Sequence, residues 1–181
     1  MLKTFPIGPG FQVQKVVGGD DRAYWLKVVT GGFEVWQTDG SEVGSGRAFT
    51  SGQLQLNSGF LPEFAMAGDQ LVFSALSGGT VGLWATDGTL GSTRKLRANI
   101  PANRLTTVGN QVYFAGDDGT HGFEPWRTDG TPTGTVMIHD VDPLSSGGSV
   151  RGSIPKLFTL SHGPVYFTAI REVEGIVKPE I

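Results

Sequence analysis

A phrase built around a tryptophan and an Asp-Gly pair occurs three times in the chain, as GFEVWQTDGSEVGS, VGLWATDGTLGST and GFEPWRTDGTPTGT. Its tryptophans are Trp36, Trp84 and Trp126, which lie 48 and 42 residues apart. A fourth copy begins at Tyr166-Phe167 but has no tryptophan after it. Self-similarity at such a period marks repeat folds, so the chain is predicted to be a short array of units of forty-odd residues.

Each unit is predicted to form four short antiparallel strands joined by hairpin turns. In the third copy these strands are expected at Arg104–Val108, Gln111–Gly116, Phe123–Thr128 and Gly134–Asp140. Four strands at this period are typical of a propeller blade. The predicted fold class is therefore all-β, a β-propeller-like array of four-stranded antiparallel blades, with about four blades.

The whole chain, 1–181, is interpreted as a single repeat domain. Its blades are expected at roughly 11–50, 62–98, 104–140 and 155–178. The N-terminal strand, 2–5, is expected to complete the last blade and close the ring, because an open end exposes strand edges that promote aggregation. Two alternatives stay open: a larger ring shared by two copies as a homodimer, and an array that is part of a longer protein.

The Asp-Gly pair of each copy is interpreted as a tight turn. The side chains of Asp39, Asp87 and Asp129 are expected to accept hydrogen bonds from backbone N–H groups two residues on, while the following glycines supply positive φ. The tryptophan is expected to fill the gap between blades, burying on the order of 150–250 Å². A feature that recurs once per blade indicates a packing device and not a ligand site.

Composition excludes several classes of function. The chain has no cysteine, which excludes disulfides, thiolate metal sites and cysteine nucleophiles. With 14 Lys and Arg against 17 Asp and Glu the net charge is −3, so no nucleic acid partner is expected. No segment has the length of a membrane helix, so no membrane insertion is expected, and an export signal would lie outside this chain.

The three copies resemble the repeat of the bacterial family named for its ELWxxDGT motif, which occurs in large secreted or surface-attached proteins. In the third copy the family's downstream G-T-x-x-x-x-D-x-x-P is present at Gly134-Thr135, Asp140 and Pro143. The upstream L-T-x-x-G-x-x-Y-F is present at Leu105-Thr106, Gly109 and Tyr113-Phe114.

This resemblance covers about residues 11 to 169, with departures at Pro125, where the family has Leu, and at Gly82, where it has Glu. It implies a propeller-like architecture and an extracellular or cell-surface location. It implies no catalytic residues and no cofactor.

The most polar loop, Asp117 to His121, brings two carboxylates and an imidazole together in sequence. Asp118 and His121 of this loop, together with Arg127 of the next strand, are the candidate binding residues, because propeller loops make contacts at the ends of the ring. The loop lacks the alternating acidic residues of an EF-hand, and solvated turns also select Asp and Gly, so no metal site is predicted.

No catalytic residue is predicted. Ser161-His162 and His139-Asp140 are adjacent in sequence, but no serine lies in a GxSxG context that would build a nucleophile elbow. Glu34 and Glu124 occupy one repeated position and are interpreted as blade-stabilising rather than as a glycosidase pair.

The predicted function is a non-enzymatic extracellular binding or adhesion module whose partner is a protein or a carbohydrate. The alternatives are a structural spacer or assembly repeat of a larger surface protein and a propeller hydrolase or lyase. Loops that differ among the copies, such as VTGG, SGGT and DDGTHG, favour binding.

Overall fold

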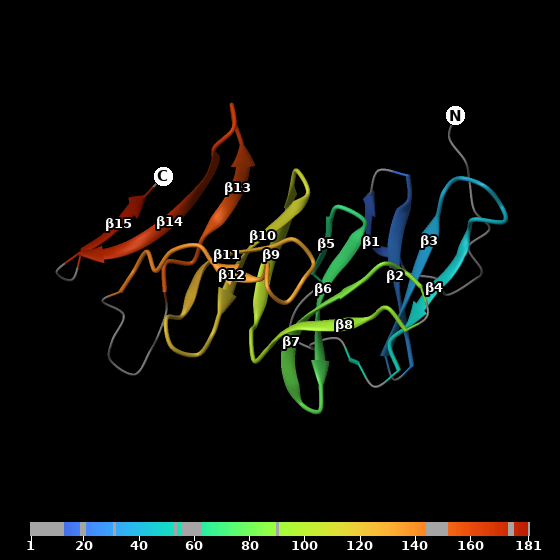
Figure 1. The fold of residues 1–181 in the computed structure, drawn as a ribbon. Helices are drawn as coiled ribbons and strands as arrows, with labels where there is room; N and C mark the ends of the chain where they lie inside the picture. The colour runs from blue at the N-terminus through green and yellow to red at the C-terminus, as the bar shows by residue number, and fades with distance from the viewer. Residues whose placement is uncertain are drawn as a thin grey trace.

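The computed structural model describes residues 13–18, 21–30, 32–52, 54–55, 63–89, 91–143, 152–173 and 176–180. These residues form strands and turns, and none of them lies in a helix. They fold into four antiparallel sheets that stand side by side in a row (Figure 1). The predicted fold class, an all-β array of antiparallel blades, is confirmed.

The strands follow one another in chain order within each sheet. The first sheet consists of β1 (Val13–Gly18), β2 (Ala23–Val29), β3 (Gly32–Thr38) and β4 (Gly46–Thr50). The second consists of β5 (Phe64–Ala67), β6 (Gln70–Ser77), β7 (Thr80–Thr86) and β8 (Arg94–Ala98). The third consists of β9 (Ala102–Val108), β10 (Gln111–Asp117), β11 (Phe123–Thr128) and β12 (Val136–Met137). The fourth, in the described part of the chain, consists of β13 (Lys156–Leu160), β14 (Val165–Val173) and β15 (Ile176–Glu180).

The first strand of each sheet lies against the first strand of the next, β1 on β5, β5 on β9 and β9 on β13. Sheets that fan out from a line of first strands have the arrangement of propeller blades. In Figure 1 the first sheet, in blue, and the fourth sheet, in red, lie at opposite ends of the row. The described residues therefore form an open array. The closing strand expected at 2–5 lies outside the described residues.

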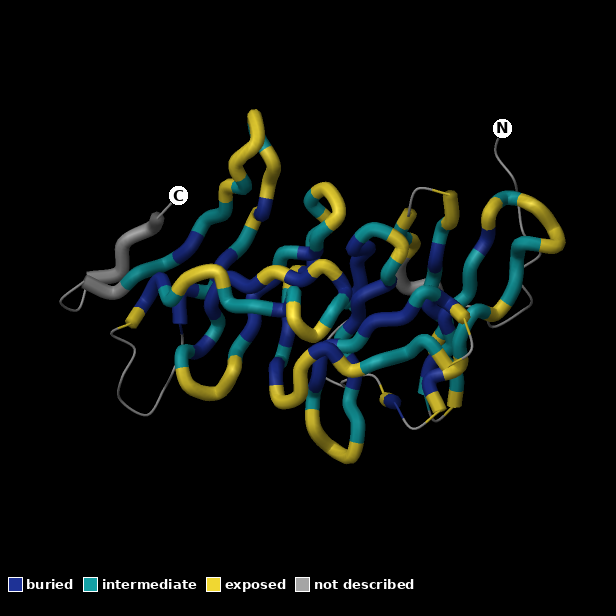
Figure 2. Tube along the Cα trace, in the orientation of Figure 1, coloured by how far each residue is buried: buried dark blue, intermediate teal, exposed yellow. Residues whose placement is uncertain are grey.

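The hydrophobic core lies between the sheets. One cluster joins the first and second sheets, where the rings of Phe33 and Phe73 meet edge to face at 5.8 Å between centroids. Another joins the second and third sheets and includes Leu83 and Phe114. Figure 2 shows buried segments along the middle of the row and exposed loops at its rims. The second sheet is apolar on both faces, as a sheet between two neighbours must be.

The fourth strand of the third sheet is shorter than predicted. The repeat predicted a strand over Gly134–Asp140, whereas β12 covers Val136–Met137. Pro125 lies opposite on β11 and has no N–H to donate, so the ladder ends with one further hydrogen bond, from Ile138 N–H to Pro125 O at 2.8 Å. The other three strands predicted in this copy agree with the structure to within two residues.

Candidate functional site

The three Asp-Gly turns share one hydrogen-bond network. In each turn an aspartate Oδ1 accepts hydrogen bonds from both the backbone N–H and the hydroxyl of the Ser or Thr two residues on. The N–H distances are 2.8 Å for Asp39–Ser41, 2.8 Å for Asp87–Thr89 and 2.9 Å for Asp129–Thr131. The hydroxyl distances are 2.7, 2.6 and 2.7 Å in the same order, and the turn glycines have φ of 88°, 83° and 85°. The predicted turn chemistry is confirmed.

A pair of hydroxyl side chains supports each turn. The threonine before the aspartate accepts a hydrogen bond from the N–H of the turn glycine and shares another with a later hydroxyl. The hydroxyl pairs are Thr38–Ser45 at 2.6 Å, Thr86–Ser92 at 2.8 Å and Thr128–Thr135 at 2.7 Å. Hydrogen bonds from the Ser or Thr hydroxyls are the main cause that lowers the pKa of the three turn aspartates. These three carboxylates act as hydrogen-bond acceptors within their own turns.

Two of the three motif tryptophans fill gaps between sheets, as predicted. Trp126 is 4% exposed, stacks on Phe114 at 6.3 Å and packs in the cluster between the second and third sheets. Trp84 packs against the cluster between the first and second sheets. Trp36 is less buried and stacks on Trp25, its cross-strand neighbour, at 6.3 Å. Trp126 and Trp84 are therefore packing residues.

The carboxylate of Glu124 ties β11 to the chain that follows. Its side chain is fully buried and accepts hydrogen bonds from the N–H groups of Val141 and Ser153, both at 2.9 Å, and from the Ser153 hydroxyl at 2.7 Å. A buried carboxylate needs such donors, because an unpaired charge in the interior is costly. Glu124 thus stabilises the connection between the third and fourth sheets.

Glu34 occupies the same repeat position in the first sheet but has different partners. Its carboxylate accepts hydrogen bonds from Arg47 Nη1 at 2.9 Å and from Trp36 Nε1 at 3.0 Å, and it lies 3.8 Å from Lys27 Nζ. Burial alone would raise the pKa of Glu34, but the hydrogen bonds from Arg47 and Trp36, with the charge of Lys27, outweigh it and lower the pKa.

The candidate residues Asp118 and His121 lie together in the β10–β11 loop. Asp118 Oδ1 accepts hydrogen bonds from the N–H groups of Thr120 and His121, at 2.9 and 3.0 Å, and Oδ2 lies 2.8 Å from His121 Nδ1. Burial acts to raise the pKa of Asp118, but the hydrogen bonds from His121 and Thr120 lower it overall. The hydrogen bond to Asp118 raises the pKa of His121. Much of this pair's hydrogen-bonding capacity is used within the loop.

Arg127, the third candidate, lies at the opposite end of the same hairpin. Asp117 pairs with Phe123 next to the loop, whereas Tyr113 pairs with Arg127 four residues further along. At about 3.4 Å per residue, roughly 14 Å of strand separate Arg127 from the loop. The structure therefore brings Asp118 and His121 together and leaves Arg127 in a separate environment.

That environment is a groove between the third and fourth sheets. One cavity of about 350 Å³, here called the Arg127 cavity, is lined by Arg127 and Tyr113 of the third sheet and by Val165 and Phe167 of the fourth. A second cavity of about 390 Å³, the Arg171 cavity, adjoins it at Val165 and Phe167. Its lining includes His139, Asp140, Tyr166 and Arg171. The groove thus combines aromatic surface with cationic, imidazole and carboxylate groups.

Sequence reasoning missed this groove because no motif marks it. Its lining comes from both the third and the fourth sheet, so the groove depends on how two sheets pack.

Across the described residues, no group of three or more histidine, aspartate or glutamate side chains is placed to hold a metal ion. A search of the same residues finds no helix with the length and apolar character needed to cross a membrane.

No family model matches the chain, and no curated protein matches it. Among solved structures it is similar to TolB from Acinetobacter baumannii, with a TM-score of 0.52 and 13% sequence identity over 89% of this chain. It is also similar to a chain of a nidogen/laminin complex, with a TM-score of 0.48 and 15% identity over 86% of this chain.

The match covers 41% of the TolB chain and 57% of the chain in the nidogen/laminin complex, so this chain spans about half the length of its structural neighbours or less. At these identities the likeness concerns the fold alone. TolB has a β-propeller fold. The chain is therefore a β-propeller-like array in which repeated turns and tryptophans build the sheets and a groove opens between the third and fourth.

Proposed function

We propose that this protein is a non-enzymatic binding or adhesion module of the ELWxxDGT-repeat type, acting outside the cell or at its surface, with a protein or a glycan as partner. The proposal is supported by the way the repeated polar residues are used. The turn aspartates are occupied by their own turns, and Glu124 is occupied by backbone N–H groups. The repeat thus leaves recognition to the residues that do not recur.

The observation that carries the proposal is the groove between the third and fourth sheets. Tyr166 is 49% exposed there, and Phe167, Asp140 and Arg171 lie beside it in the Arg171 cavity. Aromatic rings offer apolar area at low entropic cost, while guanidinium and carboxylate groups supply directed hydrogen bonds. Concave sites of a few hundred cubic ångströms with a few such groups are the usual form of ligand sites.

The test is a binding screen with the full chain, labelled and applied to arrayed glycans and to immobilised extracellular proteins. Tyr166→Ala is expected to weaken binding of the ligand found by at least about tenfold, which corresponds to 1.4 kcal/mol. Leu160→Ala is the matched control, because Leu160 is 53% exposed on the same sheet and lines neither cavity. Absence of any ligand, or equal loss in both variants, would contradict the proposal.

A further inference from the structure

A cavity of about 240 Å³ lies between the first and second sheets, and we call it the Asp69 cavity. Its apolar part consists of Tyr24 and Met66, which are both buried. Its polar part consists of Asp21 and Arg22 before β2, Asp69 before β6, and Asp87 and Thr89 after β7. Three turns that are far apart in the sequence therefore meet at one cavity.

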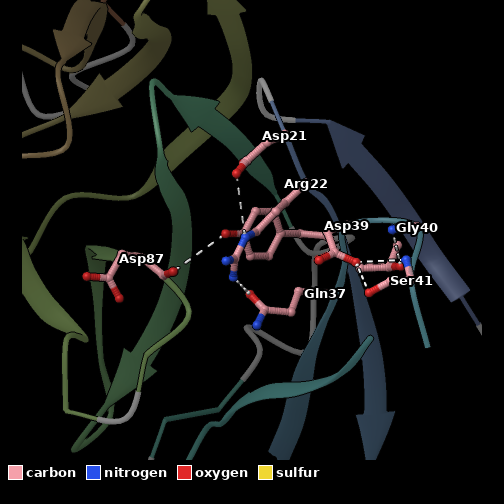
Figure 3. Close-up of polar contacts among 9 residues, drawn as sticks. Asp21, Arg22, Gln37, Asp39, Gly40, Ser41 and Asp87 are labelled. Atoms are coloured by element: carbon pink, nitrogen blue, oxygen red, sulfur yellow. Dashed lines mark hydrogen bonds and ion pairs between the residues drawn. The ribbon is translucent and has the colours of Figure 1, made fainter. Parts of the chain in front are cut away.

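The lining of this cavity is negatively charged, because three carboxylates against one guanidinium group leave a net charge of −2. Figure 3 shows Asp21, Arg22 and Gln37 on the first-sheet side of the interface and Asp87 on the second-sheet side. Arg22 Nε lies 4.0 Å from Asp21 Oδ2, and Arg22 Nη1 donates a hydrogen bond to Gln37 Oε1 at 3.2 Å. Within the described part of the chain, no cation forms an ion pair with Asp69.

The three carboxylates act on one phenol at the cavity. Burial raises the pKa of Tyr24, the charge of Arg22 lowers it, and the charges of Asp21, Asp87 and Asp69 raise it. The Tyr24 hydroxyl is held at this place by a hydrogen bond that it donates to Asp87 O, at 3.5 Å. The negative charge is therefore directed at the cavity and is not spread over separate turns.

The interface between the second and third sheets shows which group the protein itself places at such a position. There Arg94 Nη2 donates hydrogen bonds to Gln70 Oε1, at 2.9 Å, and to Gly130 O of the third sheet, at 2.7 Å. A guanidinium group thus joins the second sheet to the Asp-Gly turn of the third.

The first sheet has a glycine at the position of Arg94. Arg94 begins β8 and pairs with Ala85, the residue after the motif tryptophan. Gly46 begins β4 and pairs with Gln37, which is also the residue after the motif tryptophan. The first sheet therefore supplies no side chain of its own from this position.

The Asp69 cavity lies at the counterparts of the two groups that Arg94 contacts. Arg22 stands one residue before the partner of the motif threonine, as Gln70 does. Gly88 is the turn glycine of the second sheet, as Gly130 is of the third. Arg22 lines the cavity, and so do both chain neighbours of Gly88. One interface thus contains a guanidinium group where the other contains a cavity with a negative lining.

We propose that the Asp69 cavity binds the guanidinium group of an arginine side chain from a partner protein. The guanidinium group donates hydrogen bonds to the carboxylate of Asp69, in the favourable field of Asp21 and Asp87, while the methylene groups of the side chain lie on Tyr24 and Met66. The planar guanidinium fork matches a carboxylate and packs on aromatic rings, which an ammonium group does less well. This site is separate from the groove between the third and fourth sheets, and the inference does not rest on that groove.

The experiment titrates the full chain with N-acetyl-arginine amide and follows the amide signals by NMR. Saturable shifts are expected for Asp69 and Thr89. N-acetyl-citrulline amide has nearly the same shape without the charge, and it is expected to give no saturable shift. Equal responses to the two probes, or no saturation with the arginine probe, would overturn the inference.

A pair of carboxylate variants locates the probe. Asp69→Asn is expected to weaken binding at least about fivefold, because a charge-assisted hydrogen bond is lost. Glu42→Gln removes the same charge from an exposed turn of the first sheet that does not line the cavity, and it is expected to leave binding unchanged. Equal loss in both variants would show a general charge effect and would also overturn the inference.

A third variant supplies the arginine from within the chain. A Cβ atom on Gly46 would meet nothing within 4 Å, so a side chain can be added there without a clash. Gly46→Arg is expected to unfold cooperatively and to abolish saturable binding of the arginine probe, because its own guanidinium group enters the cavity. Gly46→Ala should leave binding unchanged. Full binding by folded Gly46→Arg would contradict the inference.

The same titration keeps this inference apart from the proposed function. Tyr166→Ala changes the groove between the third and fourth sheets and does not touch the Asp69 cavity, so it should leave binding of the arginine probe unchanged. Loss of probe binding in Tyr166→Ala would place the arginine site in the groove and overturn the inference.

Discussion

The first and third sheets carry ten-residue phrases, GFEVWQTDGS and GFEPWRTDGT, that match at seven positions but lie in different surroundings. In the third sheet the glutamate is fully buried and holds backbone N–H groups, while in the first it holds the side chains of Arg47 and Trp36. Both tryptophans stack on their cross-strand aromatic neighbour at 6.3 Å, but Trp126 is also part of the core cluster between the second and third sheets, whereas Trp36 is less buried. One motif therefore performs two physical tasks, and the neighbouring structure decides which.

The contribution of the motif to the free energy of unfolding should therefore differ between the two sheets. Removing one partner of a buried, hydrogen-bonded charge leaves desolvated groups unpaired, whereas solvent-accessible ion pairs contribute about 0–1 kcal/mol. The comparison is best tested by making the same substitution in both sheets.

The largest difference is expected for the tryptophans. Trp126→Ala should lower the free energy of unfolding by about 3–5 kcal/mol, because it opens a cavity in the core between the second and third sheets. Trp36→Ala should cost less, because Trp36 is less buried than Trp126. Urea unfolding of both variants measures the two losses in free energy of unfolding. Equal losses would contradict the proposed difference between the two sheets.

The glutamates should differ by a smaller amount. Glu124→Gln is expected to lower the free energy of unfolding by about 1.5–3 kcal/mol, since the buried donors of Val141 and Ser153 lose a charged acceptor. Glu34→Gln should cost less, because its partners Lys27 and Arg47 keep 30% and 56% of their side-chain surface exposed to solvent.

The acid dependence of Glu34 can be measured in the same unfolding experiments. Because the folded state lowers the pKa of Glu34, its contribution is present above the unfolded pKa and is lost as the pH falls through the folded pKa. In Glu34→Gln this part of the acid dependence should disappear. A larger effect at Glu34 than at Glu124 would contradict the comparison.

Substitutions at two turn glycines measure the cost of backbone strain separately from the cost of packing against a neighbouring sheet. Gly109 and Gly130 both have positive φ, 58° and 85°, but a Cβ atom on Gly109 would meet nothing within 4 Å. Gly109→Ala should therefore cost about 1–2 kcal/mol from the left-handed backbone alone. Gly130→Ala should cost at least about 1 kcal/mol more, because its Cβ atom would press on Gln70. Thermal unfolding of the two variants gives the difference, and equal costs would show that the turn is not seated on the second sheet.

The smallest effect is expected in the β10–β11 loop, DDGTHG, which is longer than its counterpart VTGG in the first sheet. NMR titration should find the pKa of His121 above its ordinary value, and Asp118→Asn should return it towards that value. Because the pKa is raised in the folded state, the stabilisation is fully present below the unfolded pKa and is lost as the pH rises through the folded pKa. A pKa of His121 that does not respond to Asp118→Asn would show that the pair does not form in solution.

Much of the fold could be predicted from the sequence because the repeat encodes local chemistry. The Thr-Asp-Gly turns form from residues within seven positions of one another, so their spacing is enough to predict them. The short β12 was missed although its cause is also local, since Pro125 stands on the adjacent strand. The prediction of that strand followed the repeat pattern and did not account for the missing N–H group of Pro125.

The candidate site could be predicted in part. Asp118 and His121 are three residues apart in one loop, so their contact follows from sequence proximity. The position of Arg127 beside Phe167, a residue 40 positions away in the fourth sheet, depends on how two sheets pack. The equivalent positions in the other copies are Gln37 and Ala85, so the repeat does not mark this position as one that lines a cavity.

The sequence by itself determined the period of the array, the four-sheet architecture and the turn at each Asp-Gly pair, because these depend on hydrogen bonds and strand alternation within one unit. The tertiary structure decided which copy of the glutamate is buried, which tryptophan faces a neighbour and where a groove remains. Those outcomes depend on what lies next to each sheet, which the motif within one sheet does not specify.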